Sequence, residues 1–255
     1  MTPVYPIQRD LPTWLWLWLP LAIIAALYIT RAVNLNIYLL MTSEMGVIEN
    51  LTVIFLIVAV ITGILLFRQI PGFPVRWFKW WVVLISVGCF YFAGEELSWG
   101  QHYIGWTVPD TWAQLNDQSE TNLHNTSELF GFLFDNLPRF LLTLVALIGG
   151  IIAPVTFLVR KKPLSFTSAN YWLWPTYVCI PVSVLALTIT IPTKIIKNTD
   201  ITLGVFSIGM GEAKECMLAM FLMLYLWSVY VRWKEFKRLS PVTSVKSTDQ
   251  LTTSH

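Results

Sequence analysis

Charged residues are scarce in this sequence. Asp, Glu, Lys and Arg make up 13% of its 255 residues, whereas hydrophobic residues make up 55%, and the mean hydropathy is +0.61. Soluble domains carry about 25% charged residues, so this shortage excludes an ordinary soluble globular domain. The formal net charge of +2 gives no indication of a nucleic-acid partner. Composition therefore predicts an integral membrane protein whose partners are membrane lipids. It leaves any protein partner unknown.

Cysteines and the common catalytic motifs are also few or absent. The three cysteines, Cys89, Cys179 and Cys216, each lie in a different apolar stretch, so they form neither a disulfide framework nor a zinc-binding pair. The sequence contains no phosphate-binding loop, nucleophile elbow, His-Glu-x-x-His motif or dinucleotide fingerprint. Functions that depend on those motifs are thereby excluded.

Long apolar stretches dominate what is present, and six reach the length of about 20 residues that a bilayer-spanning helix requires. They are residues 13–32, 47–68, 77–97, 138–159, 171–192 and 212–231. This pattern predicts an all-α polytopic membrane protein with six transmembrane helices in a single domain, residues 1–235, followed by a disordered polar tail, residues 236–255. The first stretch contains Pro20 and lacks a small-x-small cleavage site, so we expect a retained helix rather than a signal peptide.

The charged residues divide between the two ends of these stretches. Twelve of the seventeen basic residues fall on the side that holds both termini, and twelve of the fifteen acidic residues fall on the other side. An excess of Lys and Arg marks the cytoplasmic side of a membrane protein. We therefore predict a protein of the bacterial inner (cytoplasmic) membrane with cytoplasmic N- and C-termini and an acidic outer face.

One connection on the acidic side, residues 98–137, is unusually long. It has about 40 residues, and loops of that length are commonly functional or disordered. Its tryptophan, leucine and phenylalanine residues favour a folded segment, and Pro109-Asp110 and Ser119-Glu120 are typical helix starts. We expect short interfacial helices that cap the outer end of the bundle.

The most informative motif, Glu95-Glu96-Leu97-Ser98-Trp99-Gly100-Gln101, ends the third apolar stretch. Ionisable groups at membrane depth are costly and commonly functional, and the negative end of the helix dipole disfavours anions there. A cation, a metal, protons or hydrogen-bond donors must therefore compensate. Adjacent helical positions point about 100° apart, so we expect one of the two carboxylates to face the bundle and the other to face the cap.

Other acidic residues begin spans on the same side. Glu44 and Glu49 lie at the start of the second span, and Glu212 and Glu215 start the sixth. The last two are three residues apart and share a helix face. Acidic residues at helix N-termini also simply favour the helix dipole, which is an alternative explanation, above all for Glu44.

Two histidines accompany these acids. Glu120 and His124 are four residues apart and would meet on one helix face, where they could donate two metal ligands or form an acid/base couple. A loop histidine with a polar neighbour is the alternative interpretation. For His102 a simple interfacial position is the favoured interpretation.

These residues predict one outward-facing pocket. Several carboxylates cannot all stay ionised and unpaired at low dielectric, and a mixed Glu/His set that binds a divalent metal ion favours Zn, Mn or Fe. Shared protons are one alternative, and pairing with Lys194, Lys197 or Lys214 is another. The predicted metal ligands are Glu49, Glu95, Glu96, His124, Glu212 and Glu215. The predicted catalytic residues are Glu95, Glu96, Glu120 and His124.

Three motifs resemble those of a family of uncharacterised bacterial multi-pass membrane proteins. They are Glu44-Met45-Gly46-Val47-Ile48-Glu49, the E-E-x-S-W-G-Q motif at residues 95–101, and Glu120-Thr121-Asn122-Leu123-His124-Asn125, which contains N-L-H-N. The resemblance covers residues 40–130 and, less closely, the Glu212/Glu215 pair. It implies a multi-pass bacterial membrane protein and supplies no activity.

A fainter resemblance, carried by Glu49-Asn50 and Phe90-Tyr91-Phe92, is to the alkaline ceramidase-like membrane hydrolases. That family cleaves lipid amides with an intramembrane zinc ion held by three histidines, two of them on its last helix. The last predicted helix of this chain contains no histidine, so a zinc site of that kind would need carboxylates in their place.

Together these patterns favour a metal-assisted hydrolase or transferase that acts on a lipid or lipid-linked substrate at the outer leaflet. A cation- or proton-coupled transporter and a non-catalytic assembly or scaffold protein are the alternatives. No inverted repeat is evident and no charge lies in the middle of a span, which favours the enzyme over the transporter.

Overall fold

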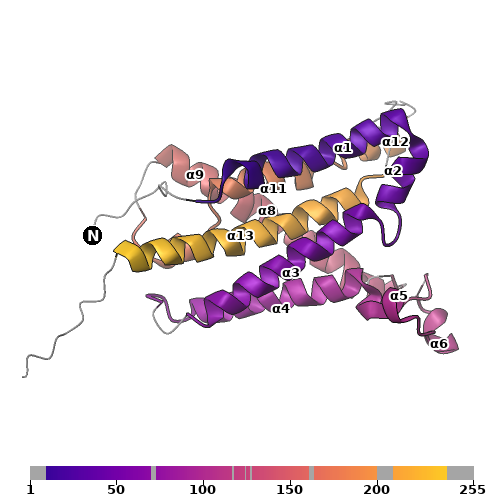
Figure 1. Ribbon diagram of the computed structural model, residues 1–255, viewed down its shortest axis with the longest axis horizontal. Coiled ribbons are helices and arrows are strands. Elements are labelled where there is room, and N and C mark those ends of the chain that lie inside the picture. Colours follow the sequence, from indigo (N-terminus) through magenta and orange to yellow (C-terminus); the bar gives the residue numbers. More distant parts are fainter. Residues whose placement is uncertain are drawn as a thin grey trace, which may run out of the picture.

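The computed structural model describes residues 10–69, 73–116, 118–123, 125–126, 128–160, 164–199 and 209–239. Throughout these residues the regular structure is helical, with one isolated β-bridge, between Asn116 and Thr126. Long helices lie side by side along one axis, and the short helices of residues 101–113 lie at one end (Figure 1). The predicted all-α membrane fold is confirmed.

The helices follow the apolar stretches. In the first half of the chain a π-helical turn, Trp14–Trp18, leads into α1 (Leu19–Val33), and then come α2 (Leu35–Thr42), α3 (Val47–Phe67), α4 (Phe78–Glu96), α5 (Gln101–Ile104) and α6 (Asp110–Ala113). In the second half are α7 (Glu128–Gly131), α8 (Leu137–Leu147), α9 (Ala153–Arg160), α10 (Ala169–Leu173), α11 (Ile180–Thr188), α12 (Ile191–Asn198) and α13 (Gly211–Leu239). Further π-helical turns, Phe132–Asn136 and Ile148–Ile152, join α7, α8 and α9.

Within the described residues, five helical segments are long and apolar enough to cross a membrane. They are Trp14–Val33, Leu35–Phe67, Phe132–Arg160, Ala169–Ile196 and Gly211–Arg238. The sixth candidate is α4 taken together with Ser98–Ile104, which bends away from α4 by 65°. These segments overlap the six predicted stretches one for one.

The last long helix, α13, forms the centre of the bundle. Every side chain from Cys216 to Leu226 is buried, and α13 packs mainly against α3 and α11. In contrast, α4 exposes Leu84, Val87 and Phe90 along one face. Apolar side chains that are exposed along a spanning helix suit contact with lipid.

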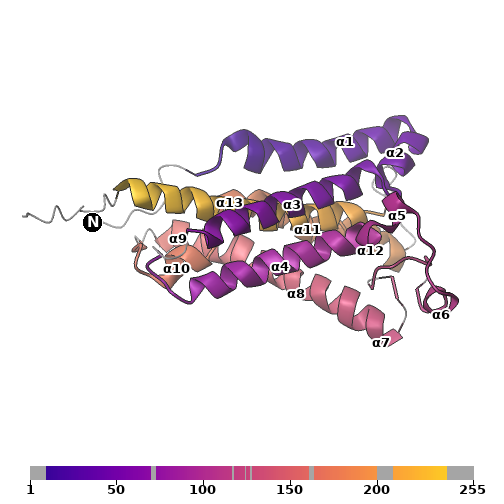
Figure 2. The ribbon, with the colours of Figure 1, turned by 60° about the horizontal axis from the view of Figure 1, so that its bottom comes forward.

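We call residues 98–136 the cap, because α5, α6 and α7 lie at one end of the long helices (Figure 2). The predicted helix start at Pro109-Asp110 is confirmed by α6. The predicted helix start at Ser119-Glu120 is wrong, since residues 118–123 are not helical. Asn116 Oδ1 accepts hydrogen bonds from the backbone N–H groups of Gln118 and Glu120 at 3.0 and 3.1 Å, and such side-chain bonds compete with helix formation.

The C-terminal helix is longer than expected. It continues to Leu239, four residues beyond the predicted end of the domain at residue 235. The rest of the predicted tail, residues 240–255, lies outside the described residues.

Candidate acidic site

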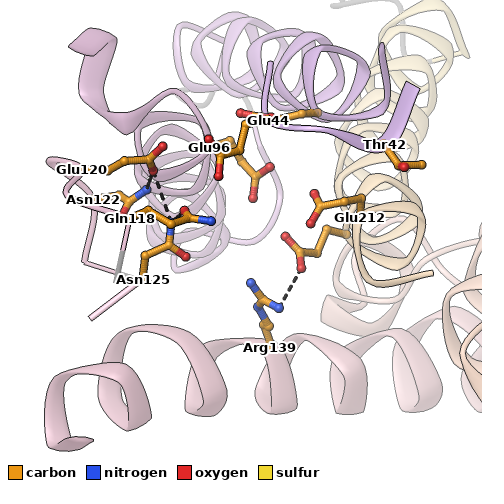
Figure 3. Close-up of a pocket in the computed structure, with 11 residues that line it drawn as sticks. Thr42, Glu44, Glu96, Gln118, Glu120, Asn122, Asn125, Arg139 and Glu212 are labelled. Carbon is orange, nitrogen blue, oxygen red and sulfur yellow. Dashed lines mark hydrogen bonds and ion pairs between the residues drawn. The ribbon is translucent and has the colours of Figure 1, made fainter. Parts of the chain in front are cut away.

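A cavity of about 310 Å³ lies where the cap meets the ends of α3, α4, α8 and α13 (Figure 3). Six carboxyl groups face it, together with one guanidinium and four uncharged polar side chains. The lining residues are Thr42, Glu44, Glu49, Glu96, Gln118, Glu120, Asn122, Asn125, Arg139, Glu212 and Glu215. Five of the seven predicted site residues are therefore brought to one cavity. The other two are Glu95, which lies elsewhere, and His124, which lies outside the described residues.

Three of these acids are close enough to share a cation. Glu96, Glu212 and Glu215 each contribute a carboxylate oxygen, and these atoms lie within 4.8 Å of one another. Glu212 and Glu215 are three residues apart on α13, as predicted, and Glu96 is the last residue of α4. Glu96 and Glu215 are 7% and 4% exposed, so little water is available to screen the repulsion between their charges.

The cation that offsets these acids is an arginine. Arg139, in the first turn of α8, places its Nη1 at 2.8 Å from Oε1 of Glu215, and its Nε contacts Asp135 one turn earlier. Figure 3 shows its guanidinium reaching from α8 toward the carboxyl groups of α13. Lys194 and Lys214, which the sequence also offered as counter-ions, are not among the residues that line the cavity, and the side chain of Lys197, the third, lies outside the described part of the chain.

The two adjacent glutamates at the end of α4 have different surroundings, as predicted. Glu96 faces the cavity, whereas Glu95 faces the cap and is 3% exposed. Oε1 of Glu95 accepts a hydrogen bond from Trp99 Nε1 at 2.8 Å, and Oε2 accepts one from the backbone N–H of Leu123 at 2.7 Å. Neutral donors thus stabilise Glu95 against the helix dipole, and its placement separates it from the predicted metal ligands.

The turn between α4 and the cap has a left-handed backbone. Ser98, Trp99 and Gly100 have φ angles of 45°, 55° and 98°, and this region costs roughly 1–2 kcal/mol for each non-glycine residue. The Trp99 ring lies against Gly94, where an added Cβ would be 2.7 to 2.8 Å from ring atoms. The turn directs Ser98 and Trp99 toward carboxylates, which explains why this strained conformation is kept.

Glu120 is a carboxylate of the cap that is surrounded by side-chain hydrogen-bond donors. Its Oε1 lies 2.9 Å from His102 Nε2, and its Oε2 accepts hydrogen bonds from Ser98 Oγ at 2.7 Å, Asn122 Nδ2 at 2.5 Å and Asn125 Nδ2 at 3.2 Å. Glu120 is 5% exposed. Four donors around one buried carboxylate fix its direction toward the cavity.

His102 and Arg139 are the two residues that sequence reasoning undervalued. The expected helix at residues 119–124 would have paired Glu120 with His124, but the non-helical backbone turns Glu120 toward His102, 18 residues earlier in the chain. Arg139 had a sequence signal, because few basic residues fall on the acidic side and this one begins a span.

The acids of the second span have local roles as well. Glu49 Oε2 accepts the backbone N–H of Met45 at 2.5 Å, just before α3 begins. This bond satisfies the N–H of the residue just before the N-cap Gly46, so the helix-start explanation holds for Glu49 in part. Glu44 and Glu49 both line the cavity but are not part of the three-carboxylate group.

The donor set defines what this site can bind. The three convergent ligands are carboxylate oxygens, which suit hard cations such as Mg²⁺, Ca²⁺ and Mn²⁺, whereas Zn²⁺ is bound mainly by nitrogen and sulfur. Of the predicted metals, Mn fits the described donors best. Comparison of the chain with protein-family models, curated proteins and solved structures finds no match.

Proposed function

We propose that this chain is a membrane-embedded, metal-assisted hydrolase or transferase that binds Mn²⁺ or Mg²⁺ between Glu96, Glu212 and Glu215. Its substrate is a lipid or lipid-linked molecule whose polar part enters the acidic cavity. The observation that carries this proposal is the convergence of three carboxylate oxygens, from two helices distant in sequence, within 4.8 Å of one another.

Spacing and charge both support a divalent cation at this position. Ligand oxygens at about 2.1 Å from an octahedral ion lie roughly 3–4 Å apart, so small side-chain rotations would complete the geometry. Six carboxylates and one guanidinium line the cavity, which leaves a large excess of negative charge. Glu96 and Glu215 are buried, where like charges are costly unless they are paired, and a divalent cation would offset two charges of the group.

A cation bound there would supply Lewis-acid activation of a carbonyl or phosphoryl oxygen and would lower the pKa of a bound water. The residues of the chain would supply the rest of the chemistry. Glu120 faces the α13 carboxylates across the cavity (Figure 3) and is the candidate general base. Gln118, Asn122 and Asn125 line the same wall, and such amides suit hydrogen bonds to the polar part of a substrate.

We place the cavity on the outer side of the bacterial inner membrane, with both termini in the cytoplasm. The direction of α13 supports this orientation, since Glu212 lies in its first turn and Lys237 and Arg238 lie in its last turn. Basic residues at one end of a spanning helix favour the cytoplasmic side. A substrate would then reach the cavity from the outer leaflet.

Metal titration tests the proposal. The full-length protein in nanodiscs would be titrated with Mn²⁺, and free Mn²⁺ would be followed by electron paramagnetic resonance. We expect about one equivalent to bind, and binding to be lost in Glu96→Gln and Glu215→Gln. Glu235→Gln is the matched control, because Glu235 lies on the same helix but pairs with Arg238 at its other end. Absence of binding, or equal loss in the control, would overturn the metal site.

A proton- or cation-coupled transporter is the second candidate, and one contact favours it. The carboxylate oxygens of Glu96 and Glu215 lie within 4.8 Å of each other, and two buried carboxyl groups this close can share a proton. Mn²⁺ uptake or internal pH change in proteoliposomes would support transport. Metal-dependent turnover of lipid substrates without uptake would support the enzyme. A scaffold would show neither activity.

A further inference from the structure

A second hollow lies in the cap, next to the acidic cavity. It has a volume of about 430 Å³ and is lined by Trp106, Thr107, Val108, Pro109, Thr111, Trp112 and Thr121. Two indoles and three threonines thus account for most of its wall. The lining includes no charged residue, and Val108 is its one branched aliphatic side chain.

Both tryptophans of the hollow are fixed through their polar edges. Trp106 Nε1 donates to Thr121 Oγ1 at 2.8 Å, and Trp112 Nε1 donates to the backbone carbonyl of Glu120 at 2.7 Å. Thr121 is anchored in turn, since its N–H and its hydroxyl both donate to Gln101 Oε1 at 2.6 Å. The indole N–H groups are therefore occupied, and the rings offer carbon surface to a ligand.

Residues 120–122 form the wall between the hollow and the acidic cavity. Glu120 and Asn122 line the cavity, whereas Thr121 lines the hollow. Thr121, in the wall of the hollow, is next to Glu120 in the chain. A group attached to a molecule in the hollow would therefore lie near Glu120.

The lining selects among the possible occupants. An acyl chain would favour aliphatic walls, and an anionic headgroup would need a cation, which this lining lacks. A sugar ring carries C–H groups that pack on indole faces and hydroxyl groups that suit the hydroxyls of Thr107 and Thr111 in the lining. We propose that the hollow binds a sugar unit, so that the substrate is a glycolipid or lipid-linked saccharide. This inference rests on the proposed function and names its substrate class.

Ligand binding to the intact protein tests the inference. The full-length chain would be prepared in nanodiscs free of glycoside detergent and titrated with methyl β-D-glucopyranoside and methyl N-acetyl-β-D-glucosaminide. Binding would be followed by saturation-transfer difference NMR. Trp106→Leu and Trp112→Leu remove a ring, Trp106→Phe and Trp112→Phe keep one, and Trp80→Leu is the control because Trp80 is a 64% exposed tryptophan of α4.

We expect at least one glycoside to bind, and its affinity to fall about tenfold in each leucine variant. The phenylalanine variants should retain most of the affinity, and Trp80→Leu should retain all of it. Binding of neither glycoside, or equal binding by the leucine variants, would overturn the inference. Quenching of Trp106 or Trp112 by brominated acyl chains would also overturn it, because the rings would then be membrane anchors.

Mn²⁺ titration of the same variants separates the two proposals. Mn²⁺ binding without glycoside binding would overturn the sugar site and leave the metal site standing. Glycoside binding without Mn²⁺ binding would do the reverse. Retained Mn²⁺ binding in the leucine variants would also show that the neighbouring cavity is still folded, so that their loss of affinity belongs to the hollow.

Discussion

The indole Nε1 of Trp99 donates a hydrogen bond to Oε1 of Glu95 over 2.8 Å. The two residues are four positions apart, with the start of the left-handed turn between them. Because the other oxygen of Glu95 accepts the N–H of Leu123, this buried carboxylate connects the end of α4 to two parts of the cap. The bond therefore holds the cap in place without occupying the cavity.

Replacing Trp99 by phenylalanine should loosen that connection. Phenylalanine lacks the benzo-ring atoms of the indole that lie against Gly94, and Glu95 would lose a donor while remaining buried, which costs about 1–3 kcal/mol. We expect a lower unfolding temperature in detergent for Trp99→Phe than for the wild type. Trp80→Phe, at an exposed position of α4, should leave that temperature unchanged. Equal stability of Trp99→Phe and the wild type would contradict the role given to this bond.

Two glycines of α4 provide a matched pair. An added Cβ at Gly94 would lie 2.7 to 2.8 Å from Trp99 ring atoms, whereas at Gly88 nothing lies within 4 Å. Overpacking costs about 1–3 kcal/mol, while alanine in a helix gains about 0.5–1 kcal/mol over glycine. Thermal unfolding should therefore show Gly94→Ala destabilised and Gly88→Ala neutral or stabilised. The same sign of change in both would argue against close packing at Gly94.

Removing the guanidinium at the cavity should make the acids more dependent on a metal. In Arg139→Gln, Glu215 loses its ion-pair partner, and because the Arg139 side chain is 42% exposed, we expect a cost below the roughly 3–5 kcal/mol of a fully buried pair. We expect the metal-free protein to unfold at a lower temperature and Mn²⁺ to raise that temperature by more than in the wild type. Arg238→Gln, whose partner Glu235 lies at the far end of α13, should show neither change.

The contact between His102 and Glu120 should appear as an energetic coupling. Their atoms lie 2.9 Å apart, and residues in one hydrogen-bond network couple by about 0.5–3 kcal/mol. A double-mutant cycle of His102→Gln and Glu120→Gln, measured by unfolding, should give a coupling in this range. A cycle of His102→Gln with Glu235→Gln should give none. Additive effects in the first cycle would show that the pair is not energetically linked.

The membrane fold and part of the site could be predicted from local sequence patterns. Apolar runs of bilayer length define the spans, and the three-residue spacing of Glu212 and Glu215 places both on one face of α13. The opposite directions of Glu95 and Glu96 follow from the 100° step of the helix. These predictions depend on regular helix geometry, which is periodic and so can be recognised in a single sequence.

The errors arose where the backbone is irregular. The expected helix at Ser119 does not form, because Asn116 bonds to the N–H groups of residues 118 and 120 and Ser119 adopts a φ of 55°. The contacts of Glu120 with His102 and of Glu215 with Arg139 join segments whose approach depends on the whole fold. No spacing rule relates such residues, so a sequence pattern could not have selected them.

The length of α4 has a consequence for the membrane itself. Its 19 residues span about 28 Å at 1.5 Å per residue, close to the hydrocarbon thickness of about 30 Å, and the chain then bends by 65° into the cap. This helix has no spare turn to match a thicker bilayer, so longer lipid chains would draw Glu95 and Glu96 toward hydrocarbon unless the bilayer thins around the protein. The length of α4 thereby ties the position of both glutamates to the thickness of the surrounding bilayer.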